Sequence, residues 1–222
     1  MHWLVADTET TGVGEDDKMV EVAWCLIDDD LDVIESGHSL INPERPIAPA
    51  ASAVHGLTAR DVADAPTAEQ YFAENLVCML GPETCLIAHN SAFDARFLQP
   101  YIPFELQQLC TLRLARKLLP DSESHKLGSL AYEFDLIDKN DRFHSADGDV
   151  ATLLRLLMFL ADRAGLGLHD LAPFSRAPIV VQLMPFGKHK GTPLKDLPSG
   201  YRHWLLTTAN IDDDLRASLL SL

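Results

Sequence analysis

Residues 3–12 read Trp3-Leu4-Val5-Ala6-Asp7-Thr8-Glu9-Thr10-Thr11-Gly12, and this stretch indicates how the chain folds. Four apolar residues in a row predict a strand buried in a sheet, and polar residues follow them directly. Residues two apart in a strand point to the same side, so Asp7 and Glu9 are expected to present two carboxylates together. The sequence therefore predicts a pair of acidic groups at the end of a buried strand.

The segments after this strand predict further strands and helices around it. Residues 19–28 and 33–41 flank the acidic turn 28–30 and predict a hairpin, and the apolar run 85–88 predicts another buried strand. Thr58, with Asp61 three residues on, predicts a helix start. Longer helices are expected from apolar spacings of three and four or from capping signals at 67–80, 91–99, 109–119, 127–134 and 147–164. This order predicts an α/β fold, a mixed β-sheet flanked by helices.

The composition excludes several classes of protein. The chain has 222 residues, of which 47% are apolar, which is enough for one full domain with a small appendage and too apolar for intrinsic disorder. No apolar run approaches the roughly 18 residues of a membrane span, and the N-terminus lacks the basic region of a signal peptide. No membrane partner is therefore expected. The cysteines form no CxxC pair, which predicts reduced thiols in a cytoplasmic protein; they are Cys25, Cys78, Cys85 and Cys110.

The charge is strongly acidic but unevenly distributed. Acidic residues number 33 against 18 basic ones, a net charge of −15, which argues against a protein that coats nucleic acid. The same balance is compatible with an enzyme that holds cations between itself and a phosphate. Residues 1–170 carry 29 acidic and 12 basic side chains, whereas residues 171–222 carry 4 and 6. Because prolines fall at this change, we predict a first domain at 1–170, a linker at 171–178 and a small basic C-terminal module at 179–222.

Two further acidic motifs join the first one. His89-Asn90-Ser91-Ala92-Phe93-Asp94 follows the predicted strand 85–88, and His144-Ser145-Ala146-Asp147-Gly148-Asp149 begins the longest predicted helix. Carboxylates that converge in one pocket repel each other and stay ionised only when cations lie among them. Oxygen ligands suit Mg²⁺ or Mn²⁺, and two such ions stabilise the attacking and leaving oxygens of phosphodiester displacement. His144 titrates near neutral pH and is a candidate general base for the water.

Each of these residues also has a structural interpretation. Asp94 is compatible with a helix-start residue that takes no part in chemistry. We interpret Asp147 as the N-cap of its helix and assign the ligand role to Asp149. Phe93 and Phe97 lie four apart on one helix face, which favours core packing over base stacking. His55 remains open between a turn residue and a residue of the substrate pocket.

Taken together, the three motifs resemble those of the DEDDh 3′→5′ exonucleases, the DnaQ-like branch of the ribonuclease H-like fold. The family pattern Asp-x-Glu with a following Thr-x-Gly is matched at 7–12, and His-Asn-x-x-Phe-Asp-x-x-Phe is matched at 89–97. His-x-Ala-x-x-Asp is matched at 144–149, and Val54-His55-Gly56-Leu57-Thr58 is similar to a turn of the family. The resemblance covers residues 1–165 and implies a ribonuclease H-like mixed sheet with a small C-terminal appendage.

The resemblance also implies roles for individual residues. Two divalent cations, Mg²⁺ or Mn²⁺, are expected at the carboxylates of Asp7, Glu9, Asp94 and Asp149. His144 is expected to activate water, so that nucleoside 5′-monophosphates are released from the 3′ end. Substrate contacts are implied for six further residues: Thr10, Thr11, Gly12, His55, His89 and Asn90.

The nucleic acid itself stays open at this point. A 3′→5′ exodeoxyribonuclease acting on single- or double-stranded DNA is the leading interpretation. A 3′→5′ exoribonuclease similar to oligoribonuclease or ribonuclease T would use the same carboxylates on RNA. A non-catalytic nucleic-acid-binding relative is disfavoured, because no ligand position is missing. The sequence indicates no oligomeric state.

The C-terminal module carries its own pattern of basic and aromatic residues. Between Arg176 and Arg202 the sole acidic residue is Asp196. The basic side chains and rings could hold a nucleic-acid strand, or they could form a solvated face over buried aromatics. Both interpretations remain open for Phe186, Lys188, Lys190, Lys195, Tyr201, Arg202 and Trp204.

Overall fold

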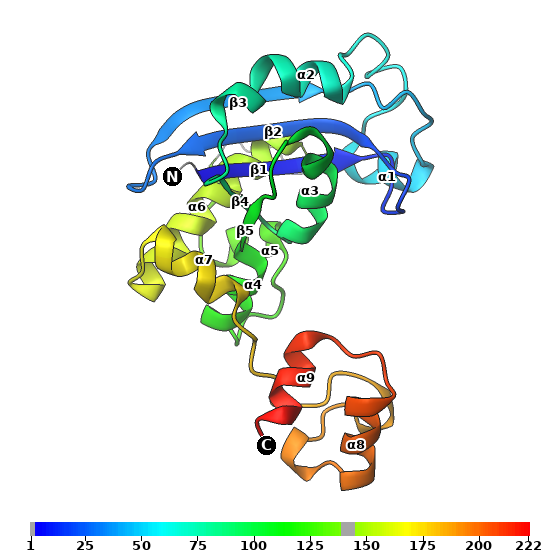
Figure 1. The fold of residues 1–222 in the computed structure, drawn as a ribbon, viewed down its shortest axis with the longest axis vertical. Coiled ribbons are helices and arrows are strands. Elements are labelled where there is room, and N and C mark those ends of the chain that lie inside the picture. The colour runs from blue at the N-terminus through cyan, green and yellow to red at the C-terminus, as the bar shows by residue number, and fades with distance from the viewer. Residues whose placement is uncertain (1–2, 139–144) are drawn as a thin grey trace. The chain divides into compact units, whose positions relative to one another are not determined.

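The computed structural model describes residues 3–138 and 145–222. The chain divides into two compact units, Met1–Arg176 and Ala177–Leu222 (Figure 1). Within the described residues, none of the helices has the length and apolar character needed to cross a membrane. The larger unit contains all three acidic motifs, so it is the unit that positions the candidate site.

The larger unit is built on a five-stranded mixed sheet with the order β3-β2-β1-β4-β5. Strand β1 lies at its centre, antiparallel to β2 and parallel to β4, so Asp7 and Glu9 in the last part of β1 lie in the middle of the sheet. Pairing is antiparallel between β2 and β3 and parallel between β4 and β5. The strands are β1 (Trp3–Thr10), β2 (Met19–Ile27), β3 (Val33–Leu40), β4 (Cys85–Ala88) and β5 (Gln107–Cys110). The predicted α/β fold with a mixed sheet is confirmed.

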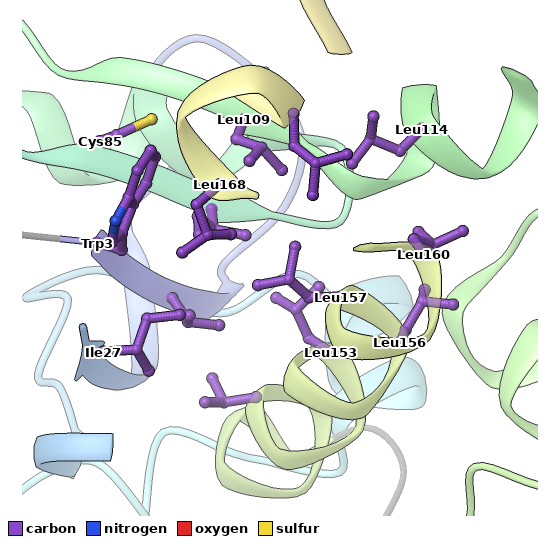
Figure 2. Close-up of a cluster of buried hydrophobic side chains, with 14 of the residues drawn as sticks. Trp3, Ile27, Cys85, Leu109, Leu114, Leu153, Leu156, Leu157, Leu160 and Leu168 are labelled. Carbon is purple, nitrogen blue, oxygen red and sulfur yellow. The ribbon is translucent and has the colours of Figure 1, made fainter. Parts of the chain in front are cut away.

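Helices cover both faces of this sheet, because successive residues of β1 point to opposite sides. Trp3 and Val5 belong to a core that includes α4, α5, α6 and α7 (Figure 2). Leu4 and Ala6 belong to a second core that includes α2 and α3. The helices of this unit are α1 (Pro49–His55), α2 (Ala68–Asn75), α3 (Ser91–Leu98), α4 (Thr111–Leu118), α5 (Leu127–Glu133), α6 (Ala146–Ala164) and α7 (Leu168–Arg176).

Four local predictions were wrong in their details. The stretch predicted as helix 109–119 begins as strand β5, because parallel pairing with β4 draws Leu109 and Cys110 into the sheet. The helix expected at 67–80 ends at Asn75, and a short 3₁₀ turn, η1 (Val77–Met79), follows it. Thr58 does hydrogen-bond to Asp61, but these residues form turns and no helix. No helix was predicted before Thr58, whereas α1 lies there and has Pro49 in its first turn, where a missing N–H is tolerated.

Helix α7 occupies most of the stretch predicted as a linker. Its last residues pack into the domain despite Pro173, since Leu171, Ala172 and Ser175 are buried. The Ser175 hydroxyl accepts from the backbone N–H of Cys110 at 3.3 Å, which ties α7 to the edge strand β5. The larger unit therefore ends at Arg176, six residues after the predicted domain boundary.

The smaller unit has an aliphatic core of its own. It contains α8 (Ser199–Thr207), α9 (Asp213–Leu220) and two 3₁₀ turns, η3 (Gly187–His189) and η4 (Leu194–Asp196). Asp212 caps α9 by accepting from the backbone N–H of Leu215 at 2.8 Å. Its buried core consists of Met184, Leu194, Leu197, Leu205, Ile211, Leu215 and Leu219.

Candidate active site

The end of β1 places the first two carboxylates side by side, as the strand period requires. Asp7 and Glu9 are half-buried, whereas Thr8 and Thr10 between and beyond them are buried on the other side of the strand. Asp149, in the first turn of α6, brings its carboxylate to the same place. Oxygen atoms of Asp7, Glu9 and Asp149 all lie within 4.8 Å of one another. Three of the four predicted ligands therefore form one cluster.

Asp94 adjoins this cluster from the other side of β1. It lies in the first turn of α3, fully enclosed, and its Oδ1 accepts from the backbone N–H of Thr8 at 3.1 Å and from the Thr8 hydroxyl at 2.9 Å. Its negative charge acts on both Asp7 and Glu9. Asp94 is thus held against the strand that carries the other acids, and it is more than a helix-start residue.

Burial and mutual repulsion make this cluster hold protons in the absence of a cation. Burial, followed by the charges of Asp94 and Asp149, raises the pKa of Asp7 well above its ordinary value. Burial and the neighbouring carboxylates raise the pKa of Glu9 to about 7. Burial raises the pKa of Asp94 to about 7 even though the Thr8 hydrogen bonds act in the opposite direction. An all-oxygen set with this much uncompensated charge fits a hard divalent cation.

Glu21 joins the site to α6, and the sequence analysis did not single it out. It lies opposite Glu9 in the β1–β2 register and is buried. One of its oxygens accepts from the backbone N–H of Ala146 at 3.3 Å, and the other lies 2.7 Å from Nε2 of His38 on β3. Glu21 therefore fixes the start of the helix that carries Asp149. A glutamate inside an otherwise apolar strand was the signal that could have revealed it.

The start of α6 differs from the prediction by two residues. Ser145 is the N-cap, and Asp147 lies within the first turn. The interpretation of Asp147 as an N-cap is therefore wrong, because the buried Ala146 already belongs to the helix and Glu21 binds its N–H. Carboxylate and imidazole atoms of Glu21, His38 and Asp147 also lie within 4.8 Å of one another, beside the acidic cluster. His144, the predicted general base, lies outside the described residues.

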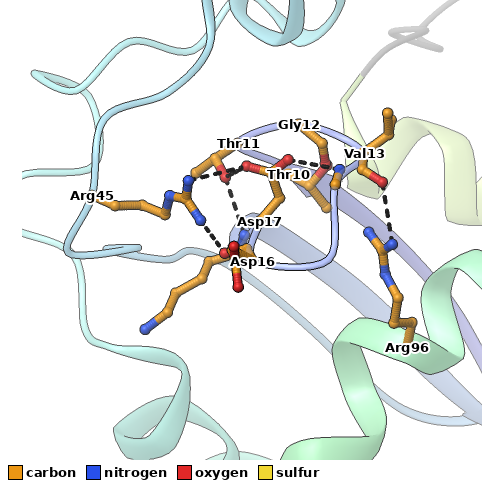
Figure 3. A network of polar contacts seen from close by, with 10 residues as sticks. Thr10, Thr11, Gly12, Val13, Asp16, Asp17, Arg45 and Arg96 are labelled. Carbon is orange, nitrogen blue, oxygen red and sulfur yellow. Dashed lines mark hydrogen bonds and ion pairs between the residues drawn. The ribbon is translucent and has the colours of Figure 1, made fainter.

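The loop after β1 is held by its own hydrogen bonds (Figure 3). The Thr11 hydroxyl donates to Oδ1 of Asp17 at 2.7 Å, and both backbone groups of Thr11 pair with Lys18 and Ala48. A Cβ on Gly12 would lie 2.5 Å from Oδ2 of Asp17, so any other residue at this position would have to displace the Asp17 carboxylate. Thr11 and Gly12 thus shape the loop, and their predicted substrate contacts stay a prediction.

The same loop is anchored from two other segments. Arg45 donates to the carbonyl of Asp16 and lies 3.5 Å from Asp17, and Arg96 of α3 donates to the carbonyl of Val13 at 3.2 Å (Figure 3). The Thr10 hydroxyl donates to the carbonyl of Gly12 at 2.7 Å. These contacts hold the loop at the end of β1, next to the acidic cluster.

The two predicted substrate-binding histidines both have fixed partners. Nδ1 of His55 accepts from the backbone N–H of Leu57 at 3.1 Å, which leaves Nε2 to donate to the carbonyl of Thr10 at 3.3 Å. Nε2 of His89 donates to the carbonyl of His125 at 2.8 Å, and its Nδ1 lies 3.0 Å from the Thr111 hydroxyl. Burial lowers the pKa of His89 to about 4, so the ring is neutral at physiological pH. His55 makes hydrogen bonds within its turn and to β1, and its substrate contact stays a prediction, whereas His89 borders the cleft described next.

A cleft of about 500 Å³ opens in front of the acidic cluster. Asp7 and Asp149 line one part of it, and His89 and the N-terminal part of α5 line the rest. No motif in the sequence pointed to α5, which contributes Leu127, Gly128, Ser129 and Tyr132, with Lys126 just before it. A second cavity of about 700 Å³ is lined by Asn90, Arg113, Arg116 and Arg176 among others. The acidic cluster is therefore open to a ligand, and basic side chains line these cavities.

The two phenylalanines of the second motif take the packing role. Phe97 is buried, Phe93 is partly buried against the same core, and their ring centroids lie 5.1 Å apart. The Arg96 guanidinium lies 4.4 Å from the Phe97 ring centroid, on the way to its bond with Val13. Both rings therefore pack in the core, the arrangement that their spacing favoured over base stacking.

Family models and curated proteins match both units of this chain. Residues 4–157 match the exonuclease family RNase_T, and residues 177–210 match a family described as a candidate quorum-sensing-regulated virulence factor. Exodeoxyribonuclease 10 of Escherichia coli (strain K12) is 29% identical over 223 residues, covering 97% of this chain and 96% of the relative. A DNA polymerase III subunit epsilon-like protein of Rhodobacter capsulatus is 35% identical over 181 residues, 73% of this chain and 25% of that protein.

Solved structures give the same result for the fold. Exonuclease X in complex with 5′ overhanging duplex DNA superposes with a TM-score of 0.65 at 28% identity, covering 78% of this chain and 99% of that one. E. coli Exonuclease I in complex with a dT13 oligonucleotide gives a TM-score of 0.62 at 19% identity, over 74% and 42%. The segment Phe186-Gly187-Lys188-His189-Lys190-Gly191 resembles a module that follows the nuclease domain in exodeoxyribonuclease X, and a match along nearly the whole chain agrees with that resemblance. The chain belongs to the DnaQ-like exonuclease family, and it is a nuclease with the ribonuclease H-like exonuclease fold.

Proposed function

We propose that this protein is a metal-dependent 3′→5′ exodeoxyribonuclease that releases nucleoside 5′-monophosphates. The observation that carries the proposal is the carboxylate cluster of Asp7, Glu9 and Asp149, with Asp94 beside it, at the edge of an open cleft. The relatives named for action on DNA and the DNA-bound solved structures support DNA as the substrate. The RNA alternative is an outcome of the test below.

Two divalent cations, Mg²⁺ or Mn²⁺, fit this oxygen-only donor set and would be held by Asp7, Glu9, Asp94 and Asp149. When bound, they would supply positive charge to the attacking and leaving oxygens of the phosphodiester. The proposal assigns His144 to take the proton from the attacking water, which a neutral imidazole does near pH 7.

The other residues of the cleft would hold the 3′ end in place. Lys126 borders the cleft together with Asp7, and Arg116 lies with Lys126 and His89 in a neighbouring hollow. The positively charged side chains of Lys126 and Arg116 can pair with the phosphates of the strand behind the scissile bond. His89, neutral and held by two partners, offers a rigid wall. Thr10 and Asn90 are proposed to contact the terminal nucleotide.

The test compares matched DNA and RNA oligonucleotides of the same sequence, each labelled at the 5′ end, with Mg²⁺. Shortening of the DNA from its 3′ end, with nucleoside 5′-monophosphates identified by chromatography, is the expected result, and a single strand and a duplex are run in parallel. Asp7→Ala should abolish cleavage, whereas Asp30→Ala in the exposed β2–β3 turn should not. Faster loss of RNA would replace the proposal with the exoribonuclease, and undiminished cleavage by Asp7→Ala would overturn the site.

We further propose that the enzyme works in the cytoplasm. All four cysteines are free, and three of them are buried. Burial raises the pKa of the Cys25 and Cys85 thiols to about 11, which keeps them unreactive. Fractionation of the native cells followed by detection of the protein tests the location.

A further inference from the structure

The aromatic residues of the smaller unit lie outside its core. The buried apolar side chains of that unit include no aromatic residue, as described above. Trp204 is 44% exposed and Phe186 is 41% exposed, while Tyr201 is half-buried at the core's edge. Of the two interpretations that the sequence left open, burial of the aromatics is therefore ruled out for Trp204 and Phe186. Large rings exposed to water without a packing role indicate a binding surface.

Three of these rings form a continuous row. The ring centroids of His189 and Tyr201 lie 4.5 Å apart, and those of Tyr201 and Trp204 lie 5.5 Å apart with planes inclined by 29°. Tyr201 and Trp204 are three residues apart on α8, so they share one face of that helix. Gly187, at φ +68°, turns the chain so that η3 packs beside the Tyr201 hydroxyl, and this brings His189 into the row.

Lysine side chains occur in the same stretch of sequence as this row of rings. The Lys188 Nζ lies 5.4 Å from the Tyr201 ring centroid, on an exposed side chain. Lys190 and Lys195 are also exposed, and Asp196 is the sole acidic residue of the stretch 177–211. Stacked rings with neighbouring cations are the two elements that bind a single strand without sequence preference. Protein interfaces, by contrast, are depleted in lysine.

We propose that His189, Tyr201 and Trp204, with Lys188 and Lys190, form a binding site for single-stranded DNA on the smaller unit. We refer to these five residues as the ring row. Bases would stack on the exposed face of Trp204, and the lysines would pair with the phosphates. The choice of DNA as ligand rests on the exonuclease function proposed above. The site is separate from the carboxylate cluster, which belongs to the larger unit.

The experiment measures binding by the full chain carrying Asp7→Ala, so that the strand is not degraded. Fluorescence anisotropy of labelled oligo-dT gives the affinity at two salt concentrations. Trp204→Ala should weaken binding about five- to a hundredfold, the effect of losing roughly one stacked base. The double variant Lys188→Ala/Lys190→Ala should weaken binding and make it less dependent on salt, since fewer counterions are released.

A spectroscopic signal reports on the ring row directly. Trp3 and Trp24 are buried, so quenching of tryptophan fluorescence by oligo-dT is expected to come from Trp204. The quenching should vanish in Trp204→Phe, while the affinity of this variant should stay near that of the parent because a ring is retained. Leu220→Ala removes an even more exposed apolar side chain of the same unit; it is the control and should change neither signal.

The result separates this proposal from the nuclease function. Cleavage of a dinucleotide by Trp204→Ala in the protein that keeps Asp7 should equal that of the parent, because the carboxylates that would cleave it belong to the larger unit and are unchanged. An unchanged oligo-dT affinity in Trp204→Ala, or binding without tryptophan quenching, would overturn the ring row and leave the active site untouched. A failure of DNA cleavage in the unmutated chain would instead overturn the nuclease proposal, and the binding measurement would still stand.

Discussion

Thr8 donates two hydrogen bonds to one oxygen of Asp94, from its backbone N–H at 3.1 Å and from its hydroxyl at 2.9 Å. Thr8 lies between Asp7 and Glu9 in β1, whereas Asp94 belongs to α3. A residue that points away from the cleft therefore fixes the fourth carboxylate against the strand that carries the first two. Hydrogen bonds to a buried charged group are worth about 1.5–3 kcal/mol each.

Removing the Thr8 hydroxyl should loosen Asp94. Thr8→Val keeps the size of the side chain but leaves the buried carboxylate short of one donor, so we expect a loss of stability of about 1–3 kcal/mol. Cleavage should require a higher Mg²⁺ concentration for half-maximal rate. Thr8→Ser, which restores the hydroxyl, should recover most of the lost stability and bring the Mg²⁺ requirement back close to that of the parent. Equal Mg²⁺ dependence in Thr8→Val and the parent would show that Asp94 needs no such support.

Asp7→Asn should separate activity from stability. Losing this ligand is expected to remove several kcal/mol of transition-state stabilisation. The rate of cleavage should therefore fall by a factor of more than roughly a hundred. The same change relieves the repulsion among Asp7, Glu9 and Asp94, so the metal-free variant should melt at a higher temperature than the parent at pH 7.5. Melting curves in EDTA check this; a lower melting temperature would mean that the carboxylates do not strain the fold.

The pKa shifts of the cluster predict how metal binding depends on pH. Glu9, ordinarily at 4.5, and Asp94, ordinarily at 3.8, are both raised to about 7 in the metal-free fold. Between the ordinary and the raised pKa values, the folded protein holds more protons than the unfolded chain. The free energy of unfolding of the metal-free protein therefore falls as pH rises through this range. The increase in melting temperature on adding Mg²⁺ should therefore grow from pH 5 and level off above about 7. Burial lowers the pKa of His89, so this residue changes stability with pH in the opposite direction. It does so both with and without Mg²⁺, and its contribution therefore cancels in the difference between the two melting temperatures.

Glu21 is expected to act as a positioning residue for Asp149. In Glu21→Ala the N–H of Ala146 loses its acceptor, and the start of α6 is free to shift. The rate at saturating DNA should fall about tenfold and the Mg²⁺ requirement should rise, while the KM for DNA stays the same. Glu21→Gln keeps an acceptor oxygen and should restore the rate.

Glu35→Ala on β3 is the control for removing an acidic side chain from the sheet, since Glu35 is exposed. This variant should behave like the parent in both rate and Mg²⁺ requirement. A KM effect in Glu21→Ala with an unchanged Mg²⁺ requirement would contradict the positioning role.

The sequence predicts those parts of this protein that local patterns control. The apolar runs of β1 and β4 mark the centre of the sheet, and the acidic motifs follow them because active-site groups collect where strands end and helices begin. The order of motifs identified the family. The strand period alone placed Asp7 beside Glu9.

Features that depend on distant partners could not be predicted in this way. Strand β5 is four residues long and exists through its pairing with β4. Glu21 and Ala146 are 125 residues apart, so no spacing rule connects them. Pro173 suggested a linker, whereas the burial of its neighbours keeps it inside α7. The role of Thr11 became visible only through its bond to Asp17.

The raised pKa values of the carboxylate cluster make this protein a source of protons when it takes up metal. Glu9 and Asp94 are partly protonated near pH 7, and ligation requires the ionised form. Each loading event therefore acidifies the surroundings, and calorimetric heats of binding should vary with the ionisation enthalpy of the buffer. If the proposed function holds, local pH and the free concentration of the divalent cation would together set how many molecules are ready to cleave DNA in a cell.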